Sequence, residues 1–192
     1  MNNRYHRYIG GMIALWAGMV MIAWKVDFTV IIGIPPGAVP MQFNTALCFL
    51  GLGLSKMWQS RGPLAGVLIV ALPTLAQDLT GINFGIDELF HPDPRLTAET
   101  PVPGRMSPAA GLFFSVLSLS GLLYYRWPEV TSWAFSFVFA ASIVFIVSYI
   151  GVLPNIYQVS DETTSIALTT AILFALYSGT ALWQQVGAPD PA

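Results

Sequence analysis

The sequence predicts an all-α integral membrane protein with six transmembrane helices, arranged as three helical hairpins of parallel orientation. Hydrophobic residues make up 55% of the 192 residues and charged residues only 9%, whereas a soluble domain usually carries about 25% charged residues. Several apolar stretches approach the roughly 20 residues that a membrane span needs. Two of them resemble one another, which indicates an internal repeat. We therefore expect a single six-helix membrane domain over residues 1–192.

Six apolar stretches are expected to span the membrane. They lie at roughly 8–24, 42–58, 63–80, 108–125, 130–151 and 163–184. Because a segment in lipid must satisfy its own backbone hydrogen bonds, these stretches are predicted to be helices, and the residue alternation of a membrane barrel is absent. The first stretch follows a basic lead, as in a signal peptide. It is long and no small-residue cleavage site follows it, so we interpret it as a retained span.

The lysines and arginines predict the orientation of the spans. If both termini share one side, that side carries Arg4, Arg7, Lys56, Arg61 and Arg126. The opposite side carries the other three cations and most of the acidic residues. Because cytoplasmic loops are enriched in positive charge, both termini are expected in the cytoplasm and the polar loop at about 81–107 outside. An interfacial aromatic belt is expected near the span ends, at Trp24, Trp58, Tyr124, Tyr125, Trp127, Trp133 and Trp183.

A repeat runs through the chain. The stretch "MQFNTALCFLGLGL" from Met41 aligns with "MSPAAGLFFSVLSL" from Met106, which pairs Phe49 with Phe114. A fainter third copy, "ETTSIALTTAILFAL" from Glu162, places Ala167 opposite Ala46. The repeats would cover about 8–58, 63–125 and 130–184, related by an axis along the membrane normal. Chance similarity between apolar helices is the competing explanation.

Small and capping residues predict how the helices pack and start. Gly10, Ala14 and Gly18 are spaced by four residues in the first stretch, a spacing that allows close approach of helices in membranes. Asn44 and Ser107 are expected to cap the backbone donors at two helix starts. These features explain tight packing without a ligand.

The polar insert "GIDELFHPDPRLTAETPVPGRMSP", from Gly85 to Pro108, stands out in an apolar chain. We favour a structural lid in which Arg105 bridges to Asp87 or Glu88. In the alternative, Asn83, Asp87, His91 and Arg105 line the outward mouth of a ligand-gated lid. There Arg105 would suit a carboxylate or phosphate group, and His91 would respond to pH.

The sequence gives little support for transport, metal binding or catalysis. Asp78, with neighbouring Gln77, is the one candidate for a polar site inside a span, where an ionisable residue would suggest transport. No metal site is expected, because a zinc site takes several His or Cys ligands and the chain has two histidines and one cysteine. No cofactor, catalytic residues or nucleic-acid partner are expected, since no nucleophile elbow and no basic stripe are present.

Three stretches carry a resemblance to a known family. "MQFNTALCFLGLGL", "GINFGIDELF" and "PGRMSPAAGLFF", in this order, resemble the membrane-embedded N-terminal sensor region of bacterial signalling proteins. In that family the region precedes PAS, histidine kinase or diguanylate cyclase modules. The resemblance covers about residues 8–184 and implies a multi-pass protein of the bacterial inner membrane. The chain departs from the family at Ala109–Leu112, where Asn-Thr-Ala-Leu is common, and no output-module motif follows, so an excised domain or a standalone relative is expected.

The leading functional hypothesis is a non-catalytic sensory input domain that relays a ligand or a membrane state to a cytoplasmic partner or output module. Its expected partners are the lipid bilayer and another membrane or cytoplasmic signalling protein, and a homodimer is expected by analogy. The alternative is an accessory or scaffolding subunit of a larger membrane complex. A small transporter or lipid-handling protein is a weaker alternative.

Overall fold

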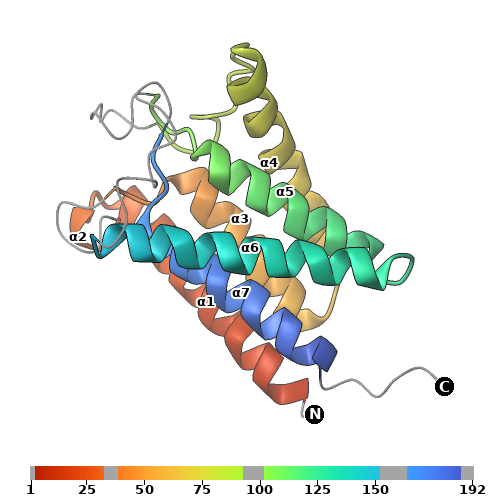
Figure 1. Ribbon diagram of the computed structural model, residues 1–192. Coiled ribbons are helices and arrows are strands. Elements are labelled where there is room, and N and C mark those ends of the chain that lie inside the picture. Colours follow the sequence, from red (N-terminus) through yellow and green to blue (C-terminus); the bar gives the residue numbers. More distant parts are fainter. Residues whose placement is uncertain (1–2, 33–38, 93–101, 152–163, 187–192) are drawn as a thin grey trace.

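The computed structural model describes residues 3–32, 39–92, 102–151 and 164–186. Within these residues all regular secondary structure is helical, so the predicted all-α class is confirmed (Figure 1). Six long helices and one single-turn helix follow in the order α1 (Asn3–Lys25), α2 (Thr29–Ile32), α3 (Phe43–Trp58), α4 (Gly62–Thr80), α5 (Pro108–Leu123), α6 (Pro128–Tyr149) and α7 (Leu168–Val186).

Each predicted stretch coincides with one long helix. By length and apolar composition, three helices are able to cross a membrane: α1 over Tyr5–Lys25, α4 and α6. Helix α5 is apolar but shorter. At 16 residues, α3 and α5 are about 24 Å long, against about 30 Å for a hydrocarbon core. The chain is therefore a helical bundle with at least three helices suited to a membrane.

The long helices alternate in direction. Helix α1 packs along α3, α4 along α5, and α6 along α7. The first turn of α1 and the last turn of α7 lie at the same end of the bundle (Figure 1). We call this the pocket end; here α3 leads into α4 and α5 into α6. The opposite end, where α4 ends at Thr80 and α5 begins at Pro108, is called the insert end.

Three phenylalanines hold the middle of the bundle together. The ring centroids of Phe49 and Phe114 are 4.7 Å apart, those of Phe49 and Phe174 are 4.7 Å apart, and those of Phe114 and Phe174 are 4.6 Å apart. All three side chains are fully buried. Since the rings come from α3, α5 and α7, these three helices form the centre, and one ring from each closes a triangle.

The triangle corrects the alignment of the third repeat. The predicted alignment places Ala167 opposite Ala46, which would put Thr170, and not Phe174, opposite Phe49. In the structure the first intrahelical bonds run from Ala46 N to Gln42 O, from Gly111 N to Ser107 O and from Ala171 N to Ala167 O. Ala171 is therefore the residue opposite Ala46. Phe174 of α7 therefore occupies the place of Phe49 in α3 and Phe114 in α5, four residues later than the predicted alignment puts it.

Helices α1 and α3 touch through backbone. A Cβ atom added to Gly10 would lie 2.7 Å from the Gly53 carbonyl oxygen, and one added to Gly53 would lie 2.6 Å from the Ala14 backbone nitrogen. The predicted close approach at Gly10 and Ala14 is therefore present. Gly18 is different, because a Cβ atom there would meet nothing within 4 Å. Small residues set the α1–α3 distance only near the pocket end.

Replacing Gly53 by alanine is expected to lower the free energy of unfolding by about 1–3 kcal/mol, the usual cost of overpacking a tight contact. The added methyl group would meet backbone atoms, which cannot turn aside. Gly18→Ala is the matched control and is expected to stabilise slightly, because alanine favours a helix over glycine. The measurement is thermal unfolding in detergent. Equal melting temperatures for Gly53→Ala and the unmodified protein would contradict the backbone contact.

The aromatic belt is only partly where the sequence places it. Six residues of the predicted belt are exposed, and all belong to segments at the pocket end: Trp58, Tyr124, Tyr125, Trp127, Trp133 and Trp183. Trp24 is buried instead, and its indole N–H donates to the Met41 carbonyl at 2.9 Å. Tryptophan at this position is a packing and hydrogen-bonding residue. The exposed aromatic side chains of the predicted belt therefore concentrate at the pocket end.

Candidate functional site

The insert end is held together by one buried carboxylate. The two carboxylate oxygens of Asp87 accept hydrogen bonds from the Gln77 side-chain nitrogen at 2.8 and 2.9 Å. Arg105 donates to Oδ2 through Nε at 2.9 Å and lies 2.8 Å from it through a terminal nitrogen. Asp87 is only 6% exposed. The predicted ion pair between Arg105 and Asp87 is therefore present, with Gln77 as a third member.

Backbone contacts complete this network. The Gln77 side-chain oxygen accepts from the Phe84 backbone N–H at 2.7 Å. The Asn44 amide donates to the Asp87 carbonyl at 2.7 Å, so Asn44 fastens the insert to α3. Gln42 is the N-cap residue of α3 and makes no side-chain cap; the predicted cap at Asn44 is wrong. Ser107 does cap α5, because its hydroxyl accepts from the Ala110 N–H at 3.2 Å.

Asp78 contacts the same arginine less closely. Its Oδ1 lies 3.4 Å from a terminal nitrogen of Arg105, and its Oδ2 is buried without a hydrogen-bond partner. The predicted polar pair Gln77 and Asp78 therefore belongs to the network that closes the insert end. Two carboxylates share one guanidinium, and the closer geometry favours Asp87.

The other two predicted insert residues lie apart from this network. The exposed Asn83 closes a local turn, with its side-chain oxygen accepting from the Gly85 N–H at 2.8 Å. The His91 ring packs against the rings of Trp24 and Phe43, at centroid distances of 5.5 and 5.4 Å. The structure thus joins Asp87 to Arg105 but does not bring Asn83 or His91 to them. A ligand role for these residues stays a prediction.

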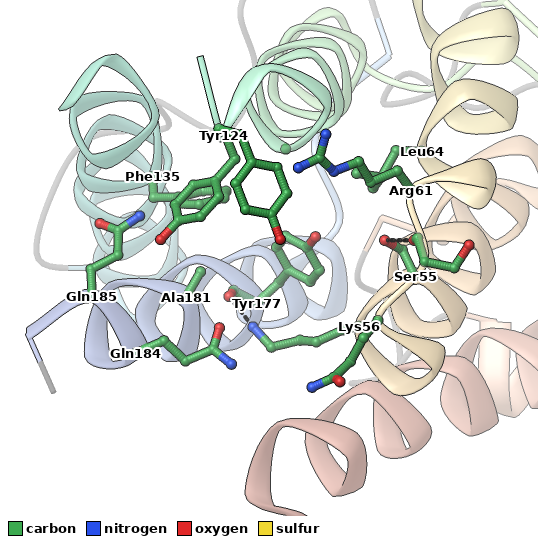
Figure 2. Close-up of a pocket in the computed structure, with 14 residues that line it drawn as sticks. Ser55, Lys56, Arg61, Leu64, Tyr124, Phe135, Tyr177, Ala181, Gln184 and Gln185 are labelled. Atoms are coloured by element: carbon green, nitrogen blue, oxygen red, sulfur yellow. Dashed lines mark hydrogen bonds between the residues drawn. The ribbon is translucent and has the colours of Figure 1, made fainter. Parts of the chain in front are cut away.

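A pocket of about 470 Å³ opens at the other end of the bundle (Figure 2). It lies among the ends of α3, α5 and α7 and the beginnings of α4 and α6. Its volume is within the range of small-molecule sites. The pocket is lined by Ser55, Lys56, Gln59, Ser60, Arg61, Leu64, Gly121, Tyr124, Tyr125, Phe135, Tyr177, Ala181, Gln184 and Gln185.

Two cations line this pocket, and none of its described lining residues is acidic. The Lys56 ammonium donates to the Tyr177 carbonyl at 3.1 Å and lies 4.6 Å from the centroid of the Tyr177 ring. Figure 2 shows Lys56 extending toward Tyr177. The Arg61 guanidinium lies 4.0 Å from the centroid of the Tyr125 ring and donates to the Leu122 carbonyl at 3.3 Å. Neither cation has a carboxylate partner among the described residues.

The wall of the pocket offers one unpartnered donor of Arg61 and several neutral polar groups. One terminal nitrogen of Arg61 is buried without a hydrogen-bond partner. Gln184 and Gln185, from the last turns of α7, contribute side-chain amides, and the Gln185 oxygen accepts from the Ser132 hydroxyl at 2.6 Å. Uncompensated positive charge beside amide and hydroxyl donors is an arrangement that binds anions, since ionised partners form the stronger hydrogen bonds.

Sequence reasoning missed this pocket. Lys56 and Arg61 entered the sequence interpretation only as markers of orientation, and Tyr124 and Tyr125 only as part of the aromatic belt. The lining residues come from positions 55–64, 121–135 and 177–185, so no short motif marks them. One signal was present: Lys56, Gln59 and Arg61 lie close together in the sequence, and no acidic residue occurs between Asp27 and Asp78.

Comparison with protein-family models, curated proteins and solved structures finds no match to this chain. The kind of ligand that the pocket binds is therefore inferred from its lining residues alone. Among the described residues, no three His, Cys, Asp or Glu side chains come together as a metal site would require. The pocket's cations and amides are instead suited to a phosphate or carboxylate group.

Proposed function

We propose that this chain is a non-catalytic, membrane-embedded sensory domain that binds an anionic ligand in the pocket at its cytoplasmic end. The observation that carries the proposal is the 470 Å³ pocket, whose described lining residues include two cations and no acidic residue. The positive charge of this pocket has no matching partner among the described residues. A ligand with a phosphate or carboxylate group would supply it.

All six long helices are spans in this proposal. Three are long and apolar enough to cross a membrane. The central helices α3 and α5 are shorter, and the insert covers the start of α3 through the contact between Asn44 and the Asp87 carbonyl. The pocket end faces the cytoplasm of a bacterial inner membrane, because it carries Lys56, Arg61 and Arg126 and positive charge marks that side. Exposed aromatic side chains at the same end suit the membrane interface.

The pocket is also placed to pass a signal onward. Lys56 links α3 to α7 through the Tyr177 carbonyl, and α7 is the last helix before the C-terminal residues. An anion in the pocket would compete for the Lys56 ammonium and weaken this link. Ligand binding then favours a packing in which α7 is less restrained, which is the differential interaction that a population shift needs. A cytoplasmic partner or output module would respond to the movement of α7.

Replacing Lys56 by methionine is expected to weaken anion binding about tenfold or more, since a hydrogen bond to a charged group is worth about 1.5–3 kcal/mol. The measurement is native mass spectrometry in neutral detergent with two probes, pyrophosphate and phosphatidylglycerol. The first represents soluble anions and the second anionic lipids. Phosphatidylcholine, which carries no net charge, is the reference for non-specific lipid binding.

Lys25→Met is the matched control, because Lys25 lies near the insert end, where it donates to the Phe90 carbonyl at 3.4 Å. It is expected to leave binding unchanged. The proposal fails if neither probe binds above the phosphatidylcholine reference. It fails equally if Lys25→Met and Lys56→Met weaken binding to the same degree, because the effect would then be one of net charge.

A second candidate function, an accessory subunit, is favoured by a separate observation. An apolar groove of about 440 Å³ runs between α1 and α7, and its wall includes the exposed side chains of Met12, Leu15 and Leu176. Such a groove suits a helix of another membrane protein. Affinity purification of the full chain in mild detergent distinguishes the two functions. A stoichiometric companion that is lost with Leu15→Gln favours the accessory role, and a chain purified alone favours the sensory one.

A further inference from the structure

A much smaller cavity lies at the insert end of the bundle. Its volume is about 10 Å³, and it sits where α3, α5 and α7 begin. The third residue of each of these helices lines it: Thr45, Ala110 and Thr170. The lining also contains Gln42, Thr164 and Ser165. We call it the axial cavity, because equivalent positions of the three central helices surround it.

The axial cavity contains polar atoms without partners. Gln42, Thr164 and Ser165 are 2%, 1% and 2% exposed. Both polar atoms of the Gln42 amide and both hydroxyl oxygens lack a hydrogen-bond partner. Buried polar groups are almost always hydrogen-bonded to protein or to ordered water. Four unpartnered atoms around one small cavity therefore indicate that a small molecule or ion is bound there.

The helix starts add donors of their own. The first N–H groups of an α-helix have no partner within the helix, and in α3 no side chain caps them. The partial positive charge of a helix start is present three times around the axial cavity. By itself this would suit an anion. The Gln42 oxygen, however, is an acceptor without a donor, and an anion cannot donate to it.

We propose that the axial cavity holds one ordered water molecule. The volume is close to the minimum that one water molecule needs. Water both donates and accepts, so one molecule can donate to the Gln42 oxygen and accept from up to two of the donors around it. An ion would lose its hydration with no charged side chain in the lining to compensate, whereas immobilising a water costs little. This inference is independent of the ligand pocket at the other end.

The water has a structural consequence. Its unpartnered neighbours are Gln42, just before α3, and Thr164 and Ser165, just before α7. The water therefore bridges the starts of these two helices, beside the start of α5. A rearrangement that moves one helix start relative to the other would break its hydrogen bonds. The water therefore holds the insert ends of α3 and α7 in register.

Water–amide cross-peaks in NMR spectra of the full chain in detergent micelles test this proposal. In chloride-free buffer, cross-peaks of the same sign as those within the protein are expected at the backbone N–H groups of Thr45 and Thr170 and at the Gln42 side-chain amide. Gln42→Met keeps a similar shape but removes both amide groups. It is expected to abolish the cross-peaks at Thr45 and Thr170, while the exposed control Gln184→Met keeps them.

Two results would overturn the proposal. Absence of the cross-peaks in the unmodified protein would show a dry cavity. Saturable shifts of the Thr45 and Thr170 signals on chloride addition would show that a small anion is the guest. Both results come from the unmodified chain, so they decide the question even if Gln42→Met fails to fold.

Discussion

Replacing Asp87 by asparagine is expected to lower the free energy of unfolding by about 3 kcal/mol, the lower part of the range for breaking a buried ion pair. Asp87 accepts from both Gln77 and Arg105 and is almost fully buried. An asparagine offers one acceptor oxygen in place of two and carries no charge. Arg105 would keep only the longer contact to Asp78, at 3.4 Å. The melting temperature in detergent is expected to fall by roughly 6–12 °C.

Asp78→Asn is the matched comparison for the effect of Asp87→Asn on the melting temperature. Asp78 contacts the same arginine, but one of its oxygens is buried without a partner, and its charge repels that of Asp87. Asp78→Asn is therefore expected to change the melting temperature by less than a third of the Asp87→Asn effect. Asp27→Asn, at an exposed position, is the control for charge alone. Equal losses at positions 78 and 87 would contradict the assignment of Asp87 as the residue that fastens the insert.

Phe114→Ala is expected to lower the free energy of unfolding by about 2–3 kcal/mol. In a water-soluble protein such a change costs about 3–5 kcal/mol, part of which is the transfer free energy of the ring from water. In a membrane the ring stays in lipid even when the helices separate, so this part of the cost is absent. What remains is the lost contact with Phe49 and Phe174, whose rings lie 4.7 and 4.6 Å away. The measurement is unfolding of the folded bundle by SDS in mixed micelles.

Two comparisons sharpen this test. Phe84→Ala, at a half-exposed position, is expected to have little effect. Phe174→Ala is expected to cost as much as Phe114→Ala, and the double variant less than the sum of the two, because both remove the same contact. Strict additivity would show that the three rings do not act as a unit.

The helices could be predicted because lipid leaves an apolar segment almost no alternative to helix. The helix ends were less certain: α1 begins at Asn3 and α7 at Leu168, against predicted starts at 8 and 163. The third repeat shows why similarity is a weak guide between apolar helices. Alanine and leucine occur often enough to align by composition, whereas Phe174 occupies its position for a packing reason that appears only in three dimensions.

The site was predictable only in part. Arg105 was expected to pair with Asp87 or Glu88 of the same insert, and the structure places Asp87 2.8 Å from it. Gln77 was expected as a neighbour of Asp78, yet its place in the network follows from the way α4 turns back at Gly81, which has a positive φ of 70°. The pocket with Lys56 and Arg61 could not be read from the sequence, because its walls come from five helices whose ends meet only in the folded bundle.

Labelling of single cysteines in intact cells tests the membrane orientation most directly, and with it the side from which the pocket is reached. Cys48 is buried and is replaced by alanine, after which one cysteine is introduced by Glu88→Cys at the insert end or Glu129→Cys at the pocket end. Both positions are exposed. A membrane-impermeant maleimide is expected to label Glu88→Cys in intact cells and Glu129→Cys only after the membrane is opened. Labelling of Glu129→Cys in intact cells, with Glu88→Cys protected, would contradict the account.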